Sequence, residues 1–145
     1  MKYPGTVLAV LLVLCAGVVA GYFLAANRPA PVPAPTPTSD PMIVIDAPLP
    51  GATVSSPLQV TGTARGPWFF EASFPVILKG PGGVILATVP AQAQGDWMTT
   101  GWVPFAATLT FPPQPSGTTG TLILQKDNPS GLPENDDSRT VTVQF

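Results

Sequence analysis

The chain has 145 residues, of which 45% are hydrophobic and only 10% are charged, and it carries 20 prolines. Few charges and many prolines argue against a mainly helical soluble protein and favour an all-β domain with attached segments. The formal net charge is -2 and the six lysines and arginines are scattered, which excludes the basic patch that nucleic acids need. Histidine is absent and Cys15 is the only cysteine, so we expect no disulfide, metal, cofactor or enzymatic activity.

A long apolar run begins close to the N-terminus. Residues 5–26 read GTVLAVLLVLCAGVVAGYFLAA and contain no charge, and as a helix they would span roughly 33 Å, enough to cross a bilayer. A cleavable signal peptide usually has an apolar core of about 7 to 15 residues, so the length favours an uncleaved signal anchor over residues 1–26. Cys15 suggests a lipoprotein instead, but Leu14 stands where a lipidation site needs a small residue. We expect Cys15 to carry no lipid.

The residues that flank this run indicate its orientation. The N-terminal amine and Lys2 precede it and Arg28 follows it, a small positive-inside bias that places the C-terminal part outside the cytoplasm. We therefore expect a single-pass protein of the cell membrane. Within the run, Gly17 and Gly21 form a GxxxG element, which would let two helices approach closely and form a homodimer.

A proline-rich segment follows the apolar run. Residues 27–41 read NRPAPVPAPTPTSDP, and because each proline fixes φ and disfavours helix in the residue before it, the segment should be extended. At about 3.1 Å per residue it would reach roughly 40 to 45 Å. We interpret it as a linker that acts as a stalk. The alternative, a ligand for a proline-recognising domain, requires such a partner on the outer side.

Residues 42–145 have the pattern of one β domain, because short alternating apolar runs are separated by Gly, Pro, Asn and Asp. Seven short strands in about 105 residues are typical of an immunoglobulin-like sandwich. The Cys-Trp-Cys signature of antibody domains is absent, so the expectation depends on the pattern alone. The predicted strands are 42–46, 58–64, 68–79, 84–89, 107–111, 121–125 and 139–145.

Three blocks of this domain carry a specific resemblance. GTARGPWFFEASFPV (62–76), GDWMTTGWVPFAATLTF (95–111) and KDNPSGLPENDD (126–137) follow one another in the order and spacing of a known family. They resemble the immunoglobulin-like domain of bacterial spore-germination and sporulation proteins, over essentially all of residues 43–145. The resemblance implies an extracytoplasmic β-sandwich with a binding or structural role. The germination-type domain that often accompanies this domain is absent from the sequence.

Glu71 stands in the middle of the aromatic stretch WFFEASF. Period-2 alternation over 68–79 places Trp68, Phe70 and Phe74 on the core face, and Phe69, Glu71 and Ile77 on the opposite face. The resembling family also carries FEA here. With no histidine or nucleophile motif nearby, catalysis is the weakest interpretation. We favour a structural carboxylate that accepts backbone N–H groups or pairs with Arg65; the alternative is a ligand contact at an apolar patch formed with Phe69 and Ile77.

The other aromatic residues have two interpretations. Trp97 and Trp102, together with Trp68, Phe70, Phe74 and Phe105, would form a stacking platform for a sugar if they were exposed. Large rings in a small sandwich usually fill the space between the sheets instead. We therefore predict a structural role in the core for Trp97 and Trp102.

The third block, residues 126–137, is rich in oxygen-bearing side chains. Asp127, Asn128 and Glu134 are of the kind that calcium prefers. Pro129 occupies the place of the second ligand of an EF-hand, and the glycine and glutamate of that motif do not follow. The segment is better interpreted as a polar hairpin loop between the last two strands.

Two functions of different kinds fit these features. The first is a binding or adhesion module on a stalk, which would bind an envelope protein or a wall polymer through one loop end or one sheet face. The second is a structural accessory subunit of an envelope complex, assembled through its transmembrane helix. An exposed apolar patch would favour the first, and loss of activity on changing Gly17 and Gly21 would favour the second.

Overall fold

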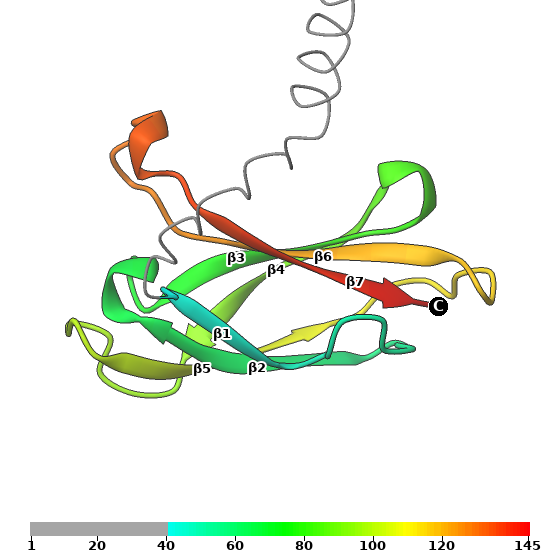
Figure 1. Cartoon of the computed structure of the whole chain (residues 1–145), viewed down its shortest axis with the longest axis horizontal. Helices are drawn as coiled ribbons and strands as arrows, with labels where there is room; N and C mark the ends of the chain where they lie inside the picture. Colours follow the sequence, from blue (N-terminus) through cyan, green and yellow to red (C-terminus); the bar gives the residue numbers. More distant parts are fainter. Residues whose placement is uncertain (1–40) are drawn as a thin grey trace, which may run out of the picture. The chain divides into compact units, whose positions relative to one another are not determined.

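The computed structural model describes residues 41–145, and these form an all-β domain of seven antiparallel strands (Figure 1). The expected strand number is confirmed. The predicted membrane anchor, the GxxxG element, Cys15 and residues 27–40 of the proline-rich linker lie outside the described residues. Within the described part of the chain, no helix is long and apolar enough to cross a membrane. The strands are β1 (Ile43–Ala47), β2 (Leu58–Arg65), β3 (Ser73–Lys79), β4 (Ile85–Ala93), β5 (Trp102–Leu109), β6 (Thr119–Gln125) and β7 (Ser138–Gln144).

The strands form one hydrogen-bonded sheet in the order β1-β2-β5-β4-β3-β6-β7. β4 and β5 share only two residue pairs, Gln92 with Ala106 and Ala93 with Phe105, and the sheet folds over at this junction. The result is one layer of β1, β2 and β5 facing a second layer of β4, β3, β6 and β7 (Figure 1). On the other side, a bridge joins Thr53, in the loop between β1 and β2, to Gln144 of β7. The domain is thus nearly barrel-like and consistent with an immunoglobulin-like sandwich.

The core lies between the two layers and is built by alternation along the strands. In β5, for example, Val103, Phe105, Ala107 and Leu109 are buried, and the residues between them face outward. At the centre Phe74 contacts Phe105 edge-to-face, with ring centroids 4.9 Å apart, and Trp68 stands at 6.4 Å from Phe74. Each such side chain contributes about 1.5 to 3 kcal/mol by leaving water.

The predicted strand 68–79 is wrong over its first five residues. Gly66–Trp68 form a 3-10 turn (η1) that contains Pro67, and β3 begins only at Ser73. The turn between them shifts the alternation, so Phe69 is buried and Phe70 is exposed, the reverse of the prediction. From Phe74 onward the predicted core face is correct, with Phe74, Val76 and Leu78 all buried.

The loops gather at two ends of the sandwich, which we call the near end and the far end. The near end holds Pro41, where the described chain begins, and the loops 66–72, 94–101 and 126–137. The far end holds the loops 48–57, 80–84 and 110–118 and the C-terminal Phe145 (Figure 1). Two further 3-10 turns lie in these loops, η2 (Pro81–Gly83) and η3 (Pro133–Asn135).

Candidate binding surfaces

A tight turn holds Glu71 between η1 and β3. The backbone N–H of Phe70 donates to Ser73 O at 3.0 Å, and the N–H of Ser73 donates back to Phe70 O at 3.1 Å. The two central residues have positive φ, 49° at Glu71 and 62° at Ala72. Positive φ at both central positions defines a type I′ turn, in which Asn and Gly are the usual residues. Glu71 is therefore part of a strained turn rather than of a strand.

Within residues 41–145, the carboxylate of Glu71 makes none of the contacts predicted for a tether. Its side chain is exposed, and among residues 41–145 it accepts no hydrogen bond and forms no ion pair with Arg65 or any other residue. The guanidinium of Arg65 instead lies over the ring of Trp102, 4.4 Å from its centroid. The guanidinium also donates to Thr100 O at 3.5 Å. The alternative role of Glu71, a contact with a ligand, stays a prediction.

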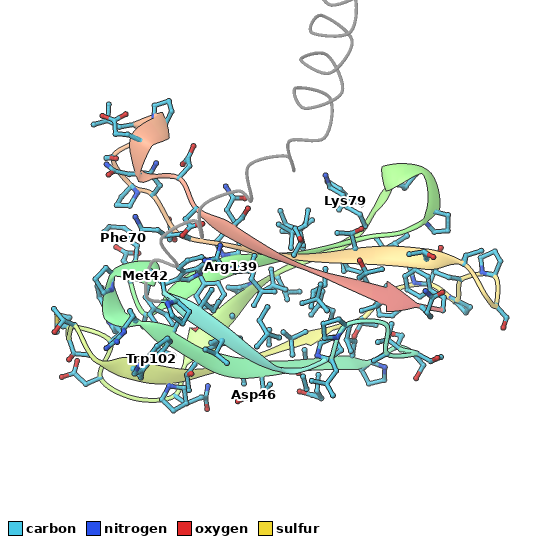
Figure 2. All side chains as sticks on the ribbon, in the orientation of Figure 1. Met42, Asp46, Phe70, Lys79, Trp102 and Arg139 are labelled. Atoms are coloured by element: carbon cyan, nitrogen blue, oxygen red, sulfur yellow. The ribbon has the colours of Figure 1, made fainter. Side chains whose placement is uncertain are left out.

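The apolar patch expected around Glu71 has a different composition from the predicted one. Phe69 is only 4% exposed and its ring lies against Phe74, with centroids 5.2 Å apart, so its side chain is not available at the surface. Ile77 is half-buried on β3. The exposed aromatic residue of this segment is Phe70, at 40%, and Figure 2 shows it at the near end of the molecule.

The two predicted core tryptophans differ from each other. Trp97 is half-buried and packs against the core from the loop 94–101. Trp102 is 39% exposed, because it occupies an outward-facing position of β5, next to the buried Val103. Its predicted place in the core is therefore wrong, and its structural contact is the stacking with Arg65 on the outer face (Figure 2).

The loop 126–137 connects β6 to β7. This agrees with its interpretation as a polar hairpin loop. It is held by its own side chains: Asn128 Nδ2 donates to Leu132 O at 2.8 Å and to Asp136 Oδ1 at 2.7 Å, and Lys126 Nζ donates to Asn135 O at 2.9 Å. Within the described residues, no three metal-binding side chains gather at one point. The polar residues of this loop therefore have a structural use, which is to stabilise a long connection.

The far end carries a cleft that the sequence did not indicate. It has a volume of about 410 Å³, within the range of sites that bind small molecules or the side chains of a partner. The rings of Phe111 and Phe145, which both line the cleft, lie edge-to-face with centroids 5.9 Å apart. No charged side chain lines it. The lining residues are Thr53, Val54, Ser55, Ser56, Phe111, Pro113, Gln114, Ser116 and Phe145.

Several polar groups at the rim of this cleft are available to a ligand. Ser56 Oγ accepts the backbone N–H of Phe111 at 3.0 Å and keeps its own O–H as a donor. Gln114 Nε2 donates to two proline carbonyls, which leaves its oxygen as an acceptor. Two loops far apart in the sequence, 48–57 and 110–118, supply these groups. No strand periodicity points to such a site, and the only sequence signal is the clustering of Ser and Pro in VSSP and PPQPS.

The near end also has a hollow, of about 470 Å³, lined by residues that include Gly66, Trp97 and Met98. It is more open to solvent than the far-end cleft. Met98 is 77% exposed there. The far-end cleft and the more open near-end hollow are both candidate surfaces for binding.

Comparison with known proteins identifies the domain. Residues 42–131 match the family model Gmad2, described as the immunoglobulin-like domain of bacterial spore germination. The matched segment covers more than half of the chain and contains the blocks 62–76 and 95–111 entire. No curated protein and no solved structure matches the chain. The chain belongs to the family of the immunoglobulin-like domain of bacterial spore germination.

Proposed function

We propose that this protein is a non-catalytic binding module of the bacterial cell envelope, with a role in germination or sporulation. Its single N-terminal membrane segment would anchor the chain, and the proline-rich linker would join that segment to an immunoglobulin-like domain outside the cytoplasm. Membership of the germination family supports the proposed role in germination or sporulation. The uncharged run 5–26 supports the anchor, and the absence of histidine from the whole chain supports a role without acid–base catalysis.

The observation that carries the binding role is the cleft at the far end. It lies at the opposite end of the sandwich from Pro41, where the linker joins the domain, so a ligand there does not compete with the attachment of the chain. The side chains that line it are apolar or polar without charge, which favours an uncharged ligand, because burying a charge without a partner is costly. An uncharged segment of an envelope protein, or of a wall polymer, has the required chemistry.

Photo-crosslinking in intact cells tests this proposal. A photoreactive amino acid in place of Ser116, at the cleft, should give a discrete adduct with one envelope component. The matched control is the same amino acid in place of Thr99, an exposed residue of the near-end loop. We expect at least a tenfold stronger adduct from position 116. Equal yields, an adduct from position 99 alone, or no adduct from either position would contradict binding at the far end.

A further inference from the structure

One edge of the folded sheet is open and apolar. β4 pairs with β3 along its length, but it meets β5 only through Gln92 and Ala93. Among residues 41–145, no strand is hydrogen-bonded to the other edge of residues 85–91. Two large exposed side chains stand where the strand begins: Val84, just before it, is 63% exposed, and Ile85, its first residue, is 59% exposed. An open edge of this kind is a template for another strand.

The free edge of β4 has less protection than the edges of the two outermost strands, β1 and β7. Residues 80–95 contain no charge, whereas β1 carries Asp46 and β7 carries Arg139. β7 is also partly covered, since the N–H of Gly51 donates to Thr142 O at 2.7 Å. Charged residues and covering segments are the usual means by which proteins prevent strands from adding to an edge. Within β4 only Pro90 has that effect.

The register of β3 and β4 shows which backbone groups of the edge are free. Pro75 lies directly opposite Pro90, and because neither residue has an N–H, they form a non-hydrogen-bonded pair. Hydrogen-bonded and non-hydrogen-bonded pairs alternate along an antiparallel ladder. Two residues earlier, Thr88 is therefore in another non-hydrogen-bonded pair, and its N–H and C=O point away from β3.

We infer that this edge binds the same edge of a second copy of the chain, with the two β4 strands antiparallel about a two-fold axis. In this arrangement the N–H of each Thr88 donates to a C=O of the other strand, and the apolar side chains at positions 84 and 85 leave water. A second copy supplies a strand that is equally uncharged, so no charge is brought into the contact unpaired. The resulting continuous sheet joins the two domains. This inference does not depend on the function proposed for the cleft.

Sedimentation of the full-length protein in detergent tests the inference. All variants carry Gly17→Leu and Gly21→Leu, which remove the close helix approach that the GxxxG element would allow. In this background we expect a concentration-dependent dimer. Ile85→Lys, which adds a charge to the edge, and Thr88→Pro, which removes the outward N–H, should each raise the dissociation constant at least tenfold. Val44→Lys is the control, because Val44 is 42% exposed on the outer strand β1, and it should leave the dissociation constant unchanged.

Circular dichroism verifies that each variant keeps its β structure. Thr88→Pro removes an N–H that makes no bond to β3, so it weakens association without removing a hydrogen bond of the domain. A monomer at every concentration would overturn the inference. It would also be overturned if the dimer persisted in both β4 variants, or if Val44→Lys weakened it as much as they do.

Discussion

Replacing Gly66 by alanine is expected to lower the free energy of unfolding by about 3 kcal/mol, the upper part of the range for overpacked buried sites. Gly66 is buried, and a Cβ atom there would overlap the backbone oxygens of Thr99 and Trp97. The two backbone segments cannot easily move apart, because the N–H of Gly66 donates a hydrogen bond to Gly101 O at 3.1 Å. The clash therefore falls on two backbone segments that close the near end.

Gly95→Ala is the matched control for this change. Gly95 lies in the adjacent loop, and a Cβ atom there would meet nothing within 4 Å. Its free energy of unfolding should stay within about 0.5 kcal/mol of the parent, as is usual for surface substitutions. Urea denaturation of the three proteins measures both values. A Gly66→Ala protein as stable as the Gly95→Ala protein would show that η1 and the loop 94–101 are not packed as described.

The second prediction concerns the turn at Glu71. The double substitution Glu71→Asn and Ala72→Gly should raise the free energy of unfolding by about 1 to 2 kcal/mol, because left-handed backbone costs an ordinary L-residue about that much and these residues relieve it. Part of the gain is offset by the greater freedom that glycine gives the unfolded chain. Thermal unfolding of the variant and the parent measures the difference.

Glu71→Gln separates the contribution of the backbone from that of the carboxylate. Since the carboxylate makes no hydrogen bond or ion pair among residues 41–145, this variant should match the parent in stability. If Glu71→Gln were strongly destabilised, the carboxylate would be a tether after all. If instead the double variant lost binding while it gained stability, the strain at residues 71 and 72 would be part of a contact surface, as strained backbone often is.

The strands were predictable because each buries one face. Leu58 and Val60 in β2, and Val141 and Val143 in β7, are buried and alternate with polar residues, and that pattern indicates both the strand and its inner face. The failure at residues 68–72 has a physical cause: five residues of strand-forming composition are divided between a 3-10 turn and a type I′ turn without glycine or asparagine at its centre. Local composition therefore gave no sign of the turn, and the predicted faces of Phe69 and Phe70 were exchanged.

The candidate binding site was less predictable than the fold. The cleft depends on Ser55, Gln114 and Phe145 being brought together by the pairing of strands that are far apart in the sequence. The free edge of β4 is likewise a property of the strand order, since the composition of residues 84–93 alone would equally suit a strand with neighbours on both sides. The contact of Arg65 with Trp102 follows from the register of β2 and β5, in which these residues are directly opposite.

The proposed function depends most on the display of the domain outside the cytoplasm, and labelling of one cysteine measures this directly. In a protein with Cys15→Ser, the substitution Ser116→Cys places a single thiol at the far end, where position 116 is exposed. We expect a membrane-impermeant maleimide to label this thiol as fully in intact cells as in disrupted cells, with the protein in the membrane fraction. Labelling that requires disruption of the cells, or a protein found in the soluble fraction, would contradict the account.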